Sequence, residues 1–369
     1  MRLITLDRCQ TGMKLGKPIY NENEKVLLAK GTELTDSLIK RLMLLNIYTV
    51  YIDDELSEGI EIVESIPKEI HLEAVSVITE CLDTIAGPNL DASNIQGMIK
   101  TERAIRSFKK IFKDILSYLT ENRTALNLLA TTKAHSNHVY THSLNVAIYS
   151  CQLAIENGLP LKKIEDIGMG AMLHDVGKMF ISPEVLNKAG ALTKDEYEYV
   201  KSHSELGFDL LRKIHEIPLT VAHCALQHHE RVDGGGYPRG LREDQIHSYA
   251  KILSVADVFD AVTSHRVYRR ALLPHKGIEL LYSGNGTQFE SKQIQLFKDC
   301  IAIYPEGLTV KLNNGTTGIV SKYNFNAVGR PIIRMIKDEE GNEIKPFEID
   351  LSSVENLTLE IIEADELLF

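Results

Sequence analysis

With 369 residues, of which 44% are hydrophobic, the chain has the composition of an ordinary soluble globular protein and the length for two or three domains. Its net charge of −10 argues against a general binder of DNA, RNA or anionic membranes, because these need a basic surface. Five scattered cysteines without C-x-x-C spacing exclude a zinc ribbon. The N-terminus lacks an apolar core of signal-peptide length, and no stretch of the chain reaches the length of a membrane span. We therefore expect a cytoplasmic protein with reduced thiols.

The first 62 residues predict a small N-terminal α/β domain. Residues 47–52 predict a strand, and Thr35 predicts the N-cap of a helix. The apolar positions of that helix are Leu38, Ile39, Leu42 and Leu45.

Residues 63–124 predict a helical linker region. A first helix over residues 66–85 is expected to end before Gly87-Pro88, and a long amphipathic helix begins at Ile95. Its apolar positions, stepping by threes and fours apart from one gap, are Ile95, Met98, Ile105, Phe108, Phe112, Ile115 and Leu119. Two interpretations stay open: the stripe packs on its own domain, or it is the seam of a coiled-coil homodimer.

Residues 125–303 predict helix after helix. Thr193 followed by Glu196 predicts a capping box at the start of a helix that carries His203. The fold class is therefore mainly α, an all-helical bundle joined to the small α/β N-terminal domain.

Residues 304–369 predict a small β-rich C-terminal appendage. Residues 309–320 and 331–336 are rich in β-branched side chains. Turn signals stand at Asn313-Asn314-Gly315 and at Glu340-Gly341-Asn342.

Seven histidines and aspartates recur through the helical region, most of them in or at the ends of apolar segments. Buried imidazoles and carboxylates are costly unless they are paired or bound to metal. Recurring at helix-length intervals, they predict one polynuclear metal site inside a helical bundle. These residues are His142, His174, Asp175, His203, His228, His229 and Asp257.

Taken singly, each of these residues has a plainer explanation. His174 and Asp175 end an apolar helix where Gly177 stands at the position of a C-terminal cap, and His203 fits a satisfied core histidine. Asp257 lies in an almost wholly apolar helix, where its alternative partner is an arginine of the same bundle. His138 precedes His142 by four residues, the usual spacing for two ligands on one helical face.

Groups suited to an anionic substrate follow the same segments. Lys178 can hold a phosphate oxygen as a point charge, and the glycines of residues 233–238 let backbone N–H groups approach a ligand. Arg266, Arg269 and Arg270, with Tyr268 among them, supply a local basic patch and a ring for stacking. The plainer alternatives are a glycine turn and arginines that complement a helix dipole.

The order H…HDxGK…H…HHExxDGxGYP…VADxFDAxxSxRxYR resembles the HD-GYP phosphodiesterases of the HD hydrolase superfamily, over roughly residues 125–303. The resemblance implies an all-helical domain that hydrolyses cyclic di-GMP to linear pGpG or to GMP. It assigns the seven residues above to metal binding. It assigns Lys178, Arg266 and Arg269 to phosphate contacts, and Gly236, Tyr237 and Pro238 to the loop that names the family.

One position departs from part of that family. Members with a three-metal centre carry a glutamate four residues before the first histidine, where this chain has His138. We therefore favour two divalent ions, with a third ligated by His138 left open. Iron or manganese is favoured by analogy and because the ligand set lacks thiolate. The mechanistic hypothesis is a hydroxide that bridges two ions sharing Asp175 and attacks the phosphorus in line, with Lys178 offsetting phosphate charge.

Two further hypotheses compete with this one. A catalytically quiet protein could bind cyclic di-GMP or a diguanylate cyclase, or another signalling protein, and pass a signal through its terminal domains. Alternatively, the hydrolase could act on another cyclic dinucleotide, since the GYP loop and the arginines do not distinguish guanine from adenine.

Overall fold

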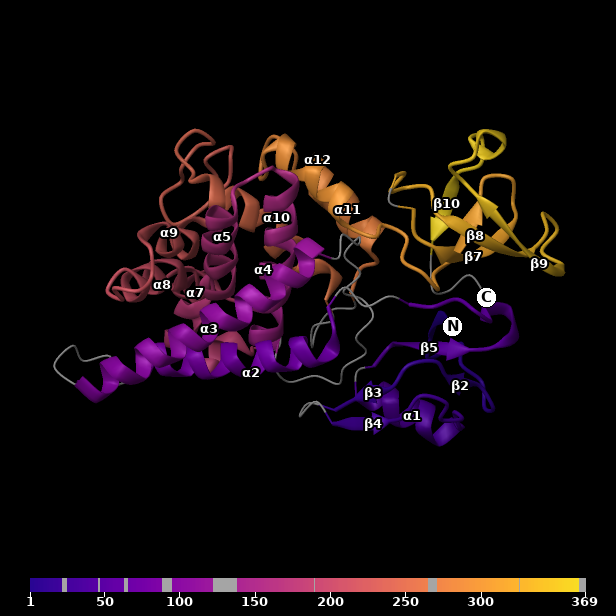
Figure 1. Ribbon diagram of the computed structural model, residues 1–369, viewed down its shortest axis with the longest axis horizontal. Coiled ribbons are helices and arrows are strands. Elements are labelled where there is room, and N and C mark those ends of the chain that lie inside the picture. The colour runs from indigo at the N-terminus through magenta and orange to yellow at the C-terminus, as the bar shows by residue number, and fades with distance from the viewer. Residues whose placement is uncertain are drawn as a thin grey trace.

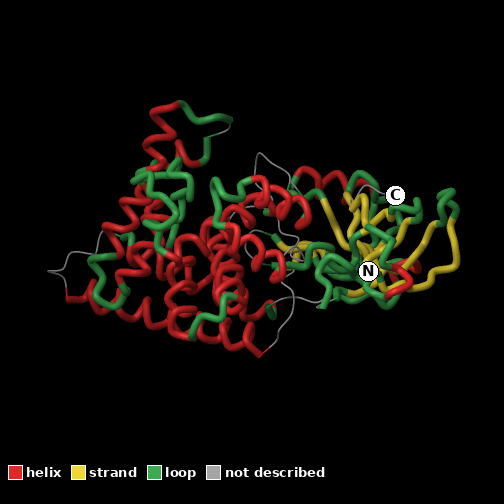
Figure 2. Tube along the Cα trace, turned by 90° about the horizontal axis from the view of Figure 1, so that it is seen from above, coloured by secondary structure: helices red, strands yellow, loops and turns green. Residues whose placement is uncertain are grey.

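The computed structural model of the chain describes residues 1–21, 25–45, 47–62, 66–87, 95–121, 138–188, 190–264, 271–324 and 326–364. A helical body lies to one side, and two strand-rich parts, formed by the two ends of the chain, lie to the other (Figures 1 and 2). The predicted fold class, mainly α with a small α/β N-terminal part and a small β C-terminal part, is confirmed. The domain boundaries at 62, 124 and 303 stay predictions.

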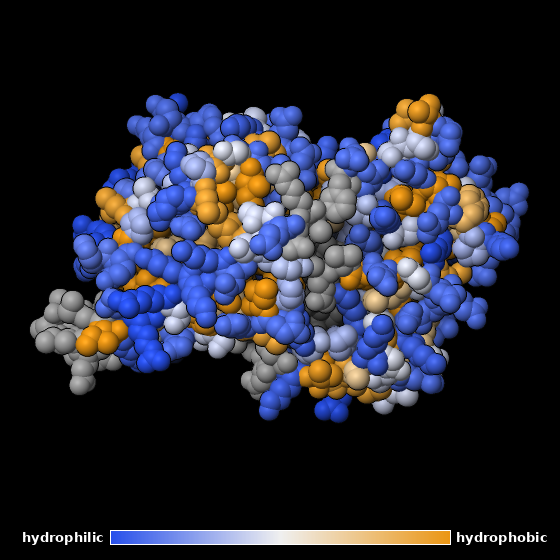
Figure 3. Space-filling model, viewed as in Figure 1, coloured by the Kyte–Doolittle hydropathy of each residue, from blue (hydrophilic) through white to orange (hydrophobic). Residues whose placement is uncertain are grey.

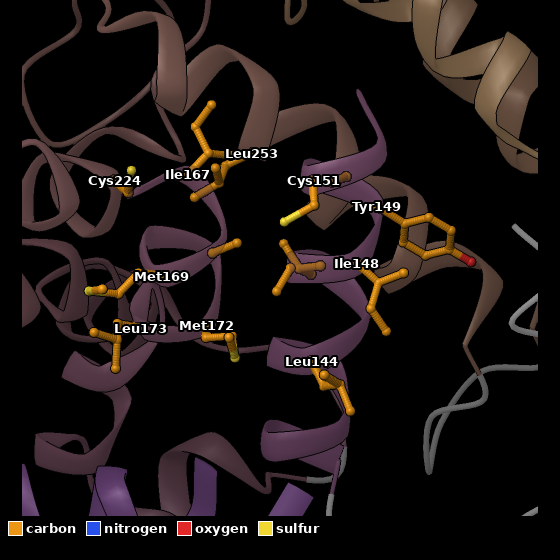
Figure 4. Packing of buried hydrophobic residues seen from close by; sticks show 14 of the residues in the cluster. Leu144, Ile148, Tyr149, Cys151, Ile167, Met169, Met172, Leu173, Cys224 and Leu253 are labelled. Atoms are coloured by element: carbon orange, nitrogen blue, oxygen red, sulfur yellow. The ribbon is translucent and has the colours of Figure 1, made fainter. Parts of the chain in front are cut away.

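The helical body is built around two central helices, α4 and α5. Buried side chains of α4, such as Leu144 and Ile148, belong to the same hydrophobic cluster as Ile167 and Met172 of α5 (Figure 4). Burial of this apolar surface is the main stabilising contribution to the body. Its helices are α4 (His138–Glu156), α5 (Leu161–Leu173), η3 (Val176–Phe180), α6 (Pro183–Leu186), α7 (Lys194–Lys201), α8 (His203–Leu211), α9 (Leu219–Gln227), α10 (Ser248–Thr263), α11 (Pro274–Ser283) and α12 (Ser291–Cys300).

Two earlier helices belong to the same core. Helices α2 (Lys68–Ile85) and α3 (Ile95–Glu121) pack against each other and against α4. The amphipathic stripe of α3, which includes Phe108, Phe112 and Ile115, is buried within the chain. The interpretation that this stripe packs on its own domain is confirmed, and these side chains are not available as a seam for a second copy.

The predicted capping box exists, but the prediction of which helix it opens was wrong. Thr193 accepts from the Glu196 backbone N–H, and the Glu196 side chain accepts from the Thr193 N–H, at the start of α7. Helix α7 ends at Lys201, and after Ser202 a separate helix, α8, begins at His203. The break places His203 at the first position of α8, and its side chain is buried there.

The N-terminal part consists of β1 (Arg2–Thr5), β2 (Lys14–Leu15), β3 (Ile19–Tyr20), β4 (Val26–Leu28), α1 (Asp36–Leu44), β5 (Thr49–Asp53) and η1 (Glu55–Ser57). Its main sheet is antiparallel in the order β1-β5-β2, and β3 pairs with β4. Thr35 caps α1 as predicted, by accepting from the Leu38 N–H. The predicted strand over 47–52 is present as β5.

The C-terminal part is a five-stranded antiparallel sheet in the order β10-β6-β7-β8-β9. Its elements are β6 (Thr309–Leu312), β7 (Thr317–Lys322), β8 (Ile332–Lys337), β9 (Glu343–Asp350), η4 (Val354–Asn356) and β10 (Ile361–Ala364). Both predicted turns are confirmed, because Gly315 and Gly341 adopt the positive φ values of 90° and 84° that tight connections between strands require.

One hydrophobic cluster contains residues from both ends of the chain. Leu3 and Tyr51 of the N-terminal sheet are buried in the same cluster as Leu308, Val310 and other residues of the C-terminal sheet. The Leu3 N–H also donates to the Gly307 carbonyl over 2.9 Å. Accordingly, the indigo and yellow parts of Figure 1 lie side by side.

Within the described ranges, no helix is both long enough and apolar enough to cross a bilayer. On the face drawn in Figure 3, hydrophobic residues appear as separate patches among hydrophilic ones.

Candidate metal centre

The structure brings the seven predicted histidines and aspartates together from five segments that are distant in sequence. His142 lies on α4, His174 and Asp175 follow α5, His203 begins α8, His228 and His229 follow α9, and Asp257 lies on α10. Their ligand atoms form three overlapping groups, in each of which all atoms lie within 4.8 Å of one another.

Asp175 stands at the centre of the cluster, and each of its two carboxylate oxygens faces a different pair of histidines, which we call the two halves of the cluster. Its Oδ1 lies 3.5 Å from His203 Nε2 and 3.7 Å from His228 Nε2. Its Oδ2 lies 3.3 Å from His174 Nε2 and 3.8 Å from His142 Nε2. This arrangement suits a carboxylate shared between two adjacent cations.

Asp257 completes the cluster from the side of α10. Its Oδ1 lies 3.1 Å from His142 Nε2 and 3.9 Å from His174 Nε2. His229, whose ring centre is 4.0 Å from that of His228, lies in one group with Asp175 and His203. The structure thus supplies imidazole and carboxylate donors of the kind that bind iron, manganese and other divalent ions.

Backbone carbonyls set the tautomer of three of these histidines. The Nδ1 atom of His174 donates to the Ala171 carbonyl over 2.5 Å, and that of His203 to the Val200 carbonyl over 2.7 Å. His228 Nδ1 donates to the Ala225 carbonyl over 2.9 Å. In neutral imidazole this leaves the Nε2 lone pair free, and in each case Nε2 points toward the cluster.

These lone pairs face each other without a proton donor to satisfy them. His203 Nε2 and His228 Nε2 lie 3.3 Å apart, and both are acceptors in the tautomer set by the carbonyls. His174 Nε2 and Asp175 Oδ1 are buried with no hydrogen-bond partner among the residues described. Buried acceptors in this state are costly, and divalent cations would satisfy them together. The residues present therefore fit a metal centre.

Asp260 supports the cluster from behind, and the sequence reasoning missed this role. Its Oδ2 accepts from His142 Nδ1 over 2.7 Å, and its Oδ1 accepts from the Asn145 side-chain amide over 2.8 Å. The Ser264 hydroxyl also donates to Oδ1 over 3.0 Å. The available signal was a second carboxylate in the apolar helix α10, one turn after Asp257.

The electrostatics favour ionised carboxylates and mostly neutral imidazoles. Burial alone would raise the pKa of Asp175, but His174 and Lys178 beside it lower that pKa well below its usual range. Burial lowers the pKa of His229 to about 3 and lowers the pKa of His228 strongly. For His142, burial opposes the charge, but hydrogen bonds to Asp257 and Asp260 raise the pKa to about 9. Metal binding would therefore release a proton from His142.

Gly177 positions two of the predicted ligands, though not as the C-terminal cap that the sequence suggested. It lies inside η3 and lacks a positive φ. A Cβ atom there would collide with the His203 carbonyl oxygen and lie 2.7 Å from the Gly207 nitrogen. Glycine therefore lets η3 lie directly against α8, which brings His203 to Asp175.

The loop of residues 229–241 forms one rim of the cluster. A Cβ atom on Gly236 would overlap the backbone of residues 229–231, so glycine lets the loop fold back on itself. The Tyr237 N–H donates to the His229 carbonyl over 3.2 Å, and the two rings lie 4.7 Å apart. Glu230, buried below the loop, accepts from the backbone N–H groups of Arg239 and Leu241, each over 2.8 Å.

Lys178 lies at the cluster, whereas the other predicted cations lie outside the described residues. Its Nζ donates to Asp175 Oδ2 over 2.5 Å, and its side chain is 28% exposed, so a ligand can reach it. The structure does not describe Arg266, Arg269 or their neighbours Tyr268 and Arg270. The side chain of His138 is likewise outside the described residues, so its predicted role as a third-ion ligand stays a prediction.

Comparison with known proteins identifies two family models along the chain. Residues 123–292 match the HD domain, and residues 309–367 match a KOW domain associated with HD domains. A cyclic di-GMP phosphodiesterase of Pseudomonas aeruginosa is 32% identical, with 60% of this chain and 53% of that protein covered. A cyclic di-GMP phosphodiesterase of Thermotoga maritima is 33% identical, with 52% of each covered.

A 3′3′-cGAMP-specific phosphodiesterase of Vibrio cholerae is also similar, at 34% identity, with 48% of this chain and 34% of that protein covered. The chain spans about half the length of the first two relatives.

Proposed function

This chain carries an HD domain of the HD-GYP group, and from that premise we propose that it is a metal-dependent phosphodiesterase that hydrolyses cyclic di-GMP to linear pGpG or GMP. The observation that carries the proposal is the cluster in which four histidine Nε2 atoms surround the two oxygens of Asp175. The names of the Pseudomonas and Thermotoga relatives support the choice of substrate.

The proposed metal ligands are the seven residues predicted from the sequence. His142, His174 and Asp175 would hold one ion, and Asp175, His203, His228 and His229 a second, with Asp257 close to both halves. Iron or manganese fits this donor set. Bound there, the ions would lower the pKa of water and offset charge on the reacting phosphate.

The chain's own groups would bind and orient the diester. Lys178, 28% exposed and next to Asp175, can exchange its contact with the carboxylate for one with a phosphate oxygen. Asp260 holds the His142 ring in place through Nδ1, so that this ligand needs no reorganisation when substrate binds. The folded-back loop would hold Tyr237 against His229, one of the proposed ligands.

In a second candidate function, the same hydrolysis acts on a cyclic dinucleotide with a different base. The similarity to a cGAMP-specific phosphodiesterase favours considering a cyclic dinucleotide that contains adenine. A catalytically quiet sensor is a weaker candidate, because every ligand position in the cluster is filled by a metal-binding side chain.

The test combines metal analysis with product analysis. Protein purified without oxygen and analysed by mass spectrometry should contain two or three iron or manganese ions per chain. Chromatography of a cyclic di-GMP digest should then show linear dinucleotide or GMP. A metal-loaded protein that leaves cyclic di-GMP intact but cleaves another cyclic dinucleotide would support the second candidate, and one that cleaves neither would support the sensor.

A matched pair of variants assigns the activity to this cluster. Asp175→Ala should lose bound metal and lower turnover by at least about 100-fold, because both halves of the cluster share this carboxylate. Asp209→Ala removes a carboxylate that is 53% exposed and paired with Arg212, and it should change neither. Retained metal and turnover in Asp175→Ala would contradict the assignment.

A further inference from the structure

A lysine and two tyrosines adjoin the metal-binding cluster, and the mechanism above does not use the lysine. Lys201 is the last residue of α7, and its Nζ lies over two aromatic rings, 4.6 Å from the centre of Tyr197 and 5.5 Å from that of Tyr237. We refer to Tyr197, Lys201 and Tyr237 as the rim group.

The rim group is continuous with the proposed catalytic cluster. The Tyr237 ring lies 4.7 Å from that of His229 and 6.4 Å from that of His203. Lys201 precedes His203 by two residues, across the break between α7 and α8. When a molecule binds with a phosphate at the cluster, the part of that molecule next to the phosphate would therefore lie at the rim group.

The rim group is open to a ligand. Tyr197 is 48% exposed, and the side chain of Lys201 is 25% exposed. The ammonium pairs with Glu198 over 2.7 Å, but the Glu198 side chain is 68% exposed. Ion pairs at such exposed positions contribute little to stability, so a ligand can displace Glu198 readily.

We propose that the rim group is a purine-binding subsite in which Lys201 selects a base with a carbonyl oxygen at C6. An ammonium is a donor without acceptor capacity. Guanine presents two acceptors, O6 and N7, on that edge, whereas adenine presents the N7 acceptor beside a donor amino group at C6. Lys201 therefore favours guanine and hypoxanthine over adenine. This inference rests on the proposed function, because it assumes a nucleotide phosphate at the cluster.

The aromatic rings favour a base at this position over a second phosphate. The faces of Tyr197 and Tyr237 carry partial negative charge, which disfavours a phosphate and suits the stacking of a base. The exposed ring of Tyr197 provides a stacking surface when the Lys201 ammonium, which lies over that ring, moves aside to meet the edge of the base.

The test measures binding without turnover. Mononucleotides contain no phosphodiester, and inosine and adenosine monophosphates differ only in the group at C6 and in the hydrogen that hypoxanthine carries on N1. Titration calorimetry on the metal-loaded full chain should show that GMP and IMP bind about tenfold more tightly than AMP. Lys201→Met should remove this difference by weakening GMP and IMP while leaving AMP unchanged, and Lys201→Arg should retain a preference for the carbonyl bases.

Two further variants complete the design. Tyr197→Leu should weaken all three mononucleotides, because stacking does not depend on the group at C6. Lys194→Met, at the exposed first position of the same helix, should change none of them.

Several results would overturn the inference. The first is a wild-type protein that binds the three mononucleotides equally or does not bind them. The second is an equal weakening of all three by Lys201→Met, which is the result expected if Lys201 contacted the phosphate. The third is unchanged binding by the Tyr197→Leu variant. Cleavage of cyclic di-GMP is measured in a separate experiment. A protein that fails to cleave it but binds IMP over AMP through Lys201 would overturn the proposed substrate and leave the subsite in place.

Discussion

At the residue scale, the metal-binding cluster depends on side chains that do not themselves face it. Asp260 is the clearest example, because it is 2% exposed and bonded to His142, Asn145 and Ser264. Because three donors hold this buried carboxylate in place, it fixes the orientation of the His142 ring. The position of Asp260 therefore influences the metal affinity of the cluster, although its own oxygens accept hydrogen bonds from side chains.

We expect Asp260→Asn to weaken metal binding by roughly 10–100-fold, with the fold retained. Asparagine has nearly the same shape as aspartate, but it lacks the charge that makes His142 a stronger ligand. Its amide NH2 group would also face a donor that now bonds to a carboxylate oxygen. A competition titration with a metal chelator measures the affinity, and circular dichroism measures the helix content. Asp209→Asn, on the exposed face of α8, serves as the control. Equal affinities of the two variants would show that Asp260 has no part in metal binding.

At the scale of single elements, the loop of residues 229–241 depends on one glycine. Gly236 lies so close to residues 229–231 that a methyl group has no room. We expect Gly236→Ala to displace Tyr237 from His229 and to lower kcat/KM for the cyclic dinucleotide by about tenfold or more, because a displacement of about 1 Å near a reacting group has costs of this size.

Steady-state kinetics with a thermal melt test this expectation. The melting temperature should change little, because the loop lies at the surface of the helical body. Gly329→Ala is the matched control, since a Cβ atom there would meet nothing within 4 Å among the described residues. Unchanged kinetics in Gly236→Ala would mean that the loop does not position Tyr237 for substrate.

The same elements show what could be predicted from the sequence. Asp257 was predictable because a carboxylate in an apolar helix needs a cation, and the structure places it beside His142. The break at Ser202 was not, because two helices joined by one residue in helical conformation leave the periodicity nearly continuous. Gly177 was interpreted by its distance from a helix end, although its contact with His203 depends on packing between α8 and η3 that local sequence does not encode.

At the scale of the whole molecule, the two ends of the chain form one unit beside the helical body. Leu3, Tyr51 and Ile62 share a buried cluster with residues of the C-terminal sheet, and the Gly307 carbonyl accepts from the Leu3 N–H. Arg334 of β8 also donates to the Glu58 carbonyl. No local pattern predicts this pairing, because it joins segments about 300 residues apart. It follows that each sheet buries part of its apolar surface against the other, although the N-terminal part also has a separate cluster that includes Ile4, Leu15 and Val50.

We expect Leu308→Ala to destabilise both sheets together, by about 3 kcal/mol in the free energy of unfolding of that unit. Leu308 is 0% exposed and lies in the cluster that joins them, so the variant leaves a cavity between the two. Hydrogen exchange followed by mass spectrometry should show faster exchange in β1 and β5 as well as in β6 and β7, with α4 and α5 unchanged. Val354→Ala, at a position 85% exposed, should change the exchange of neither sheet. If only the C-terminal strands exchange faster, the two sheets are separate folding units, and the shared cluster is a contact between units that are stable on their own.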